Sequence, residues 1–213
     1  MAKIWKIGNS PPSGAPEFAY SSHKGVIPYI QNFLTSPHPY RSGAMCPFMP
    51  RALAERNIYF TYFETEKTDQ ELQQLIKFCS DFYKNNRNNS FGAVIILFNE
   101  EFDLNRLLRA HIKAKITCID NELMIGALYK ESQASSLHSQ DYFPLRTPTP
   151  VLVIRDLTTQ DLQFLHPNHY GIISKIKFLN KYIQKFSKPS AKGKTKEKQM
   201  KQLFYADDTQ QLS

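Results

Sequence analysis

A segment at residues 37–50 brings together three side chains that could do chemistry. It reads Pro-His-Pro-Tyr-Arg-Ser-Gly-Ala-Met-Cys-Pro-Phe-Met-Pro and carries an imidazole at His38, a guanidinium at Arg41 and a thiol at Cys46. Each of its four prolines fixes its own φ and removes a backbone donor, and each disfavours helix at the residue before it. The sequence therefore predicts a rigid, irregular segment in which a functional site would be expected.

The thiol of Cys46 has two interpretations. As a thiolate it would be a nucleophile or a ligand of a metal or haem, which requires a lowered pKa that Arg41 or Arg51 could provide. As a thiol it would be a small buried apolar side chain, the commoner fate of a free cysteine, and we favour this interpretation. Cys79 and Cys118 fit it more clearly, because Cys79 lies on the apolar side of an expected helix.

The six histidines show no spacing typical of a metal site on a helix. Neither HxxxH, HExxH nor CxxC occurs, which argues against zinc held by a helix. His111 lies on an otherwise apolar helical face and is expected to be a core or pocket residue. His138 lies in a long loop, residues 130–149, and loops longer than ~12–15 residues are often functional. His138 is therefore the main candidate among the histidines.

A second segment rich in proline covers residues 142–155. Three prolines precede a buried strand, and Arg146 and Arg155 bracket it. Arginine at a strand end can hold a carboxylate or phosphate through two parallel hydrogen bonds. Ordinary salt bridges explain the pair equally well, with partners such as Asp156, Asp141 or Glu122. The chain has no GxSxG, GxxxxGK[ST] or GxGxxG sequence, which argues against a serine hydrolase, a phosphate-binding loop and a Rossmann fold.

Hydrophobic periodicity predicts the elements that position these residues. A first helix is expected over 22–35 with Pro28 in its first turn, and Thr68 with Glu71 forms a capping-box pattern that begins a second helix. The remaining expected elements are a helix over 102–115, strands over 58–63, 94–98, 123–129 and 150–155, a short helix capped by Thr158, and a last helix from Pro167 to Phe186. This order predicts an α/β fold, with α+β as the alternative, built on a four-stranded mixed sheet flanked by helices.

Composition divides the chain into three parts. Residues 1–20 are expected to be an irregular arm, 21–186 a single domain and 187–213 a flexible basic tail. The net charge is +8, but ten lysines and one acid in residues 175–201 give that segment +9 and leave −1 for the rest. The fold therefore lacks a spread basic face, whereas the tail over 188–201 could contact RNA, an anionic membrane or nothing.

Location and assembly are predicted only in outline. The sequence has no run of the ~18–20 apolar residues that span a bilayer and no apolar secretory segment at its start. We therefore expect a cytoplasmic protein with reduced thiols. A homodimer is left open.

Three groups of residues, taken in order, resemble an uncharacterised bacterial domain-of-unknown-function family. The first group includes His38, Arg41 and the sequence Cys46-Pro47-Phe48, and the second is Leu-Met-Ile-Gly at 123–126. The third is Pro-Leu-Arg-x-Pro-x-Pro-x-Leu-x-Ile-Arg at 144–155, followed by Asp-Leu-x-Phe-Leu at 161–165. That family is distantly similar to the YqcI/YcgG-type proteins, some of which are haem-dependent enzymes that N-hydroxylate amino or guanidino groups.

The resemblance implies a site for haem b. Where the family is expected to have Phe-His, this chain has Leu128-Tyr129, so His138 becomes the first candidate for the metal ligand and Cys46 the second. His38 and Arg41 would also contact the cofactor. Arg146 and Arg155 would hold its propionates or a substrate carboxylate. The pocket wall would come from Phe48, Phe143 and Tyr129.

Three functions follow, from different classes. The preferred hypothesis is a haem-binding oxygenase acting on a small-molecule substrate, an amine or amino acid. The alternative is a non-catalytic binding or sensor module whose basic tail contacts RNA or anionic lipid. A third is nucleophilic chemistry through Cys46 and a histidine.

Overall fold

The computed structural model describes residues 2–87, 91–136, 138–165 and 170–186. The chain separates into two compact units, one ending at Asp161 and the other beginning at Leu162. Each unit is described by itself. The lysine-rich segment 188–201 lies outside the described residues.

The first unit is built on one mixed sheet of five strands, in the order β1-β2-β3-β5-β4. β2 and β3 are parallel, and the other neighbouring pairs are antiparallel. The strands are β1 (Trp5–Lys6), β2 (Ile58–Tyr62), β3 (Ala93–Leu97), β4 (Leu123–Leu128) and β5 (Val151–Asp156).

The expected four-stranded sheet was wrong by one strand. The segment predicted to be an irregular arm supplies β1, in which Trp5 pairs with Phe60 of β2. A strand of two residues is too short to show alternation, so no periodic pattern could have predicted it.

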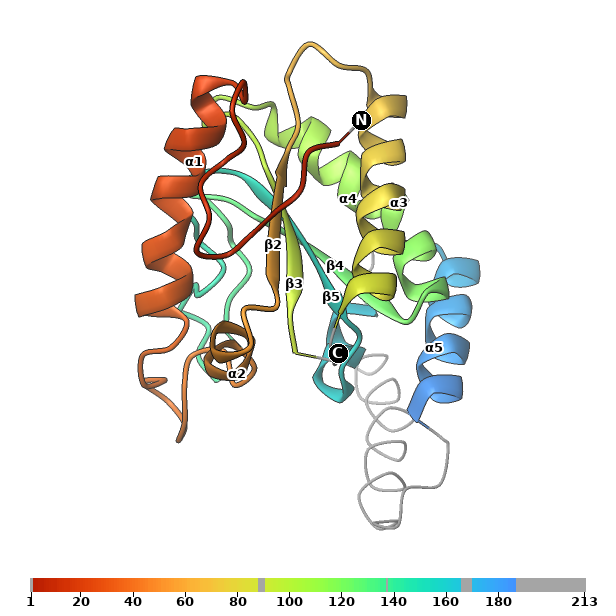
Figure 1. Ribbon diagram of the computed structural model, residues 1–213. Coiled ribbons are helices and arrows are strands. Elements are labelled where there is room, and N and C mark those ends of the chain that lie inside the picture. Colours follow the sequence, from red (N-terminus) through yellow and green to blue (C-terminus); the bar gives the residue numbers. More distant parts are fainter. Residues whose placement is uncertain (1, 88–90, 137, 166–169, 187–213) are drawn as a thin grey trace. The chain divides into compact units, whose positions relative to one another are not determined.

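Helices cover both faces of the sheet (Figure 1). On one face lie α1 (Glu17–Pro28), its π-helical continuation η1 (Tyr29–Phe33) and the short α2 (Met49–Ala54). On the other lie α3 (Asp69–Asn86) and α4 (Leu104–Asp120). The capping box that begins α3 is present as predicted, with Thr68 and Glu71 bonded reciprocally.

The first helix differs from its prediction. It begins at Glu17, so Pro28 is its last residue rather than part of its first turn. Proline has no N–H to donate to the preceding turn, and the chain continues from it as the wider turn η1.

Each face of the sheet has its own apolar core. Alternate residues of β3 divide between them, with Val94 and Ile96 in the core under α3 and α4, and Ile95 and Leu97 in the core under α1. All five residues of β3 are buried, as expected of a central strand covered on both faces.

The second unit contains most of η2 (Thr159–Leu165) and all of α5 (Ile172–Phe186). The rings of Tyr170 and Phe178 meet edge to face, with their centroids 5.1 Å apart. Over the part of the chain that the structure describes, no helix is long and apolar enough to cross a membrane.

Candidate functional site

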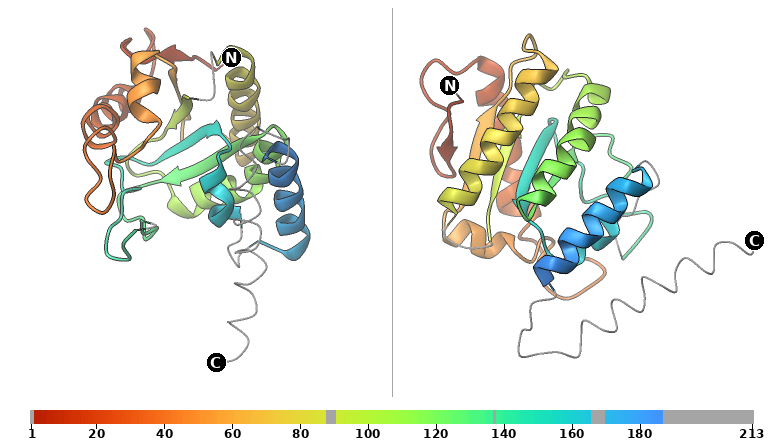
Figure 2. Two further views of the ribbon diagram at one scale, coloured as in Figure 1. Left: turned by 90° about the horizontal axis from the view of Figure 1, so that it is seen from below. Right: turned by 90° about the vertical axis from the view of Figure 1, so that its right-hand side faces the viewer.

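The two proline-rich segments meet at a group of four rings. His38 lies 5.2 Å from His138 and 5.9 Å from Tyr142, measured between ring centroids, and Tyr40 lies 5.7 Å from Tyr142. The left view of Figure 2 shows the loop after α1 (orange) approaching the loop after β4 (teal). We call His38, Tyr40, His138 and Tyr142 the histidine–tyrosine cluster.

A short antiparallel ladder shapes the first of these loops. Gly43, opposite His38, has φ of +92°, a conformation that favours glycine at the turn. The pairing places His38 and Met45 on the same side of the ladder, because diagonal partners share a face. The ladder bonds are His38 N–H to Gly43 O at 2.9 Å, Met45 N–H to Ser36 O at 2.7 Å and Cys46 N–H to Leu34 O at 2.9 Å.

Tyrosine hydroxyls fasten the second segment to the first and to η1. The hydroxyl of Tyr142 donates to Met45 Sδ at 3.3 Å. The hydroxyl of Tyr29, in η1, donates to the carbonyl of Pro144 at 2.7 Å. Burial raises the pKa of Tyr29, with smaller contributions from Cys46 and Tyr142, so this hydroxyl keeps its proton.

The two imidazoles of the cluster differ in burial and bonding. His38 is buried, and its Nδ1 accepts the backbone N–H of Tyr40 at 3.1 Å. Burial, then Arg41 and His138, holds the pKa of His38 below its ordinary value of 6.5, so this ring is neutral and carries its proton on Nε2. His138 is exposed.

Two of the predicted arginines are already engaged. Arg41 donates to three backbone carbonyls of its own loop, those of Ser42, Ala44 and Met45. Arg155 donates to both carboxylate oxygens of Asp161 at 2.7 Å. The ion pair therefore exists for Arg155, with a partner that was not among those considered.

Asp161 is a buried carboxylate to which the sequence assigned no role. Burial would raise its pKa, but the hydrogen bonds from Arg155 and from the N–H and hydroxyl of Thr158 outweigh burial and lower it. The signal was present, because Thr158 and Asp161 have the spacing of a helix cap.

Arg146 is the predicted arginine that remains accessible. It is exposed, its Nε donates to the carbonyl of Ser132 at 3.0 Å, and its guanidinium lies 4.2 Å from the ring centroid of Phe143. Its two terminal nitrogens make no hydrogen bond among the described residues.

Three other predicted residues are held by contacts of their own. Cys46 is half-buried and continues the ladder of the first loop. Phe48 precedes α2 and lies 5.9 Å from Phe91. Tyr129 packs against the core under α3 and α4.

The comparisons place the chain in a family. A family model described as a domain of unknown function (DUF6875) matches residues 23–198. The chain belongs to this family. The expectation of an uncharacterised domain family is thereby confirmed. No curated protein and no solved structure matches the chain.

In this DUF6875 chain the four rings lie within the matched residues, whereas β1 precedes them. Among described residues, no group of three or more His, Cys, Asp or Glu side chains could hold a metal ion. The cluster offers two histidines and two tyrosines, and Met45 beside it accepts a hydrogen bond from Tyr142. A cofactor that brings its own equatorial ligands, as haem does, requires fewer protein ligands than a bare ion.

A separate open groove of about 550 Å³ lies at the carboxyl end of β2. Tyr62, Phe63 and Phe78 line it together with Lys67 and Glu71. None of the predicted site residues takes part in it. Glu71 is already engaged as the cap of α3.

Proposed function

We propose that this protein is a haem-binding oxidoreductase, an oxygenase acting on a small amine or amino acid, with its centre at the histidine–tyrosine cluster. The observation that carries the proposal is the meeting of His38 and His138, which come from loops a hundred residues apart in sequence. The distant resemblance to haem-dependent N-oxygenases supplies the cofactor class. Bound haem would supply oxygen binding and one-electron chemistry.

His138 is the residue proposed to ligate iron. Its ring is exposed and lies beside tyrosine-bearing loops. Imidazole is a common axial ligand of haem iron. An accessible imidazole beside aromatic surface meets the first requirement of a haem site.

His38 is proposed to position His138 rather than to bind iron. The two rings meet at 81°, edge to face, which is the arrangement of packed neighbours rather than of ligands on opposite sides of a planar cofactor. The bond from the backbone N–H of Tyr40 fixes the tautomer of His38. Groups that pack on a metal-ligating histidine set its orientation.

Arg146 is proposed to hold a propionate or the carboxylate of the substrate. Its terminal nitrogens form the planar fork that binds a carboxylate through two hydrogen bonds. Phe143 and Tyr142, next to each other in the chain, would provide the apolar wall. Arg41 and Arg155 are left out because their nitrogens are already bonded.

An absorption spectrum tests the proposal. The protein is incubated with haemin, freed of excess and compared with His138→Ala and with the control His111→Gln. His111 is a histidine of α4 whose Nε2 lies 3.0 Å from the carbonyl of Ile125. We expect a Soret band from the wild type and the control, and its loss or displacement in His138→Ala.

Two results would overturn the assignment. A wild-type protein that takes up no haem would contradict the proposal that haem is the cofactor. A spectrum unchanged by His138→Ala would contradict the proposal that His138 is the ligand, provided that circular dichroism shows both variants to be folded.

A further inference from the structure

The open groove at the carboxyl end of β2 is bordered by the N-terminal segment, which crosses β2 toward α3 (Figure 1). Lys3 lines it from that segment, Tyr62 from the end of β2, and Glu71 and Phe78 from α3. Its volume of about 550 Å³ lies within the range of small-molecule sites. Ligands of open α/β sheets bind outside the carboxyl ends of the strands, so both the place and the size suit a small ligand.

Two accessible rings give the groove an apolar surface. Phe78 is 43% exposed although its side chain is large and apolar, and Tyr62 is partly exposed. The ring of Tyr62 also lies 6.4 Å from that of Trp5, the only tryptophan of the chain. A ligand with an aromatic ring would remove these surfaces from water and could stack on them.

The groove carries charges of both signs, and only some of them are paired. Lys67 forms an ion pair with Glu64 at 3.4 Å. Lys3 donates to the carbonyl of Ser13 at 3.2 Å, and among the described residues no acid lies within 4 Å of its ammonium group. Lys3 therefore keeps donors for an anionic group of a ligand.

Glu71 supplies the matching negative charge. The N–H and the hydroxyl of Thr68 both donate to its Oε2, at 2.7 and 2.9 Å, and its Oε1 accepts no hydrogen bond among the described residues. These bonds, with Lys67 at longer range, hold the pKa of Glu71 below its ordinary value, so it is an anion at neutral pH. One of its two oxygens is thus left for a cationic group.

We propose that this groove binds a free amino acid with an aromatic side chain, in its zwitterionic form. The carboxylate binds Lys3, the ammonium group binds Oε1 of Glu71, and the ring packs on Tyr62 and Phe78. A simple anion would satisfy only Lys3 and a simple amine only Glu71, whereas the zwitterion makes a charge-assisted bond to each. None of the four rings of the histidine–tyrosine cluster lines the groove, so the proposal does not depend on haem.

The fluorescence of Trp5 in the full-length protein tests the proposal. Titration with L-phenylalanine should change the emission saturably, with half-saturation below about 1 mM. Phenylpropionate lacks the ammonium group and phenethylamine lacks the carboxylate, so each should bind about tenfold more weakly. Saturation-transfer NMR on the ring protons of each ligand detects binding independently of the emission.

Three variants locate the ligand. Glu71→Gln keeps a residue that can complete the capping box but loses the charge, and Lys3→Met loses the ammonium group. Each should weaken the binding of phenylalanine about tenfold, and Phe78→Ala about fivefold. The matched controls are Lys24→Met on α1 and Ile112→Ala on α4, where Ile112 is 40% exposed. Both should bind like wild type.

Three results would overturn the proposal. The first is a wild type for which neither emission nor NMR detects phenylalanine. The second is phenylpropionate or phenethylamine binding as tightly as phenylalanine, which would leave Glu71 or Lys3 without a role. The third is binding that the three groove variants leave intact, and its loss in Arg146→Met would then place the amino acid at the histidine–tyrosine cluster. Thermal melts show whether each variant is folded.

Discussion

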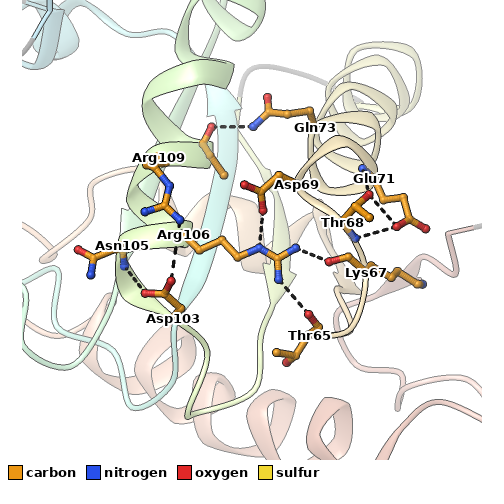
Figure 3. Close-up of polar contacts among 11 residues, drawn as sticks. Thr65, Lys67, Thr68, Asp69, Glu71, Gln73, Asp103, Asn105, Arg106 and Arg109 are labelled. Atoms are coloured by element: carbon orange, nitrogen blue, oxygen red, sulfur yellow. Dashed lines mark hydrogen bonds and ion pairs between the residues drawn. The ribbon is translucent and has the colours of Figure 1, made fainter.

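Two regions of the first unit use polar side chains to join segments that are distant in sequence, and they use them in opposite ways. At the start of α4, Arg106 connects three groups before and within the first turn of α3 (Figure 3). Its nitrogens donate to Asp69 and to the carbonyls of Thr65 and Lys67. The guanidinium also lies over the rings of Phe63 and Phe102.

The histidine–tyrosine cluster is organised differently. Its rings meet mainly through edge contacts, and the ring nitrogens of His138 make no hydrogen bond among the described residues. All three nitrogens of the Arg106 guanidinium donate to the start of α3 or to the residues just before it, whereas the exposed imidazole of His138 keeps a lone pair for a ligand. The two regions therefore differ in the donors and acceptors that stay available to a ligand, and this difference distinguishes a structural network from a candidate site.

The largest expected effect is on the Arg106 network. Arg106→Leu removes a largely buried cation with its bonds to a carboxylate and two carbonyls. We expect the free energy of unfolding to fall by about 3 kcal/mol, because the carbonyls lose charge-assisted donors. Urea unfolding measures the change.

Arg109→Leu is the matched control for this variant. It lies one turn along α4, is 64% exposed, and makes an ion pair with Asp103 at 3.9 Å. Its effect should stay within about 0.5 kcal/mol. Equal effects for the two arginines would show that the Arg106 network contributes no more than an ordinary surface charge.

Sequence predicted local structure well and the site only in part. The capping box of α3 and the buried strand β3 are confirmed. Both could be predicted because each has a pattern within its own residues. The strand β1 and the turn η1 have no such pattern, since they depend on partners or on a proline at the end of a helix.

Contacts between polar groups were harder to predict when the two partners lie far apart in the sequence. The sequence marked the proline-rich segments 37–50 and 142–155 as candidates, and the structure places the ring of His38 in the first 5.9 Å from the ring of Tyr142 in the second. Arg106 shows no pattern at all, because its bonds reach back across some forty residues to loop carbonyls.

An intermediate effect is expected at His38. His38→Ala removes a buried ring and the acceptor of the Tyr40 N–H, which should cost about 1–2 kcal/mol. Because the pKa of His38 is lowered in the folded state, the folded protein binds fewer protons than the unfolded chain. The contribution of neutral His38 to the free energy of unfolding is therefore complete above the ordinary pKa of 6.5. It is lost as the pH falls below that value.

Urea unfolding between pH 7.5 and 5.5 (about one unit on either side of a free histidine's pKa) measures this dependence. His38→Asn keeps a side-chain acceptor but does not titrate, so its stability should fall less steeply over that interval. His23, whose pKa burial also lowers, remains in both proteins and contributes the same background. Parallel slopes for wild type and His38→Asn would contradict a neutral, buried His38.

The smallest effect on stability is expected at the residue proposed to matter most for function. His138 is exposed and its ring contacts His38 at one edge, so His138→Ala should change the free energy of unfolding by less than about 0.5 kcal/mol. In the same variant the Soret band should be lost or displaced, whereas Arg106→Leu should keep it under conditions where it is folded. A loss of stability as large as that of His38→Ala would mean that the ring of His138 is held in the packing and is not accessible to iron. Stability and spectrum measured on one variant therefore decide between two readings of His138. Either its free ring nitrogen binds haem iron, or the ring is merely exposed on a loop.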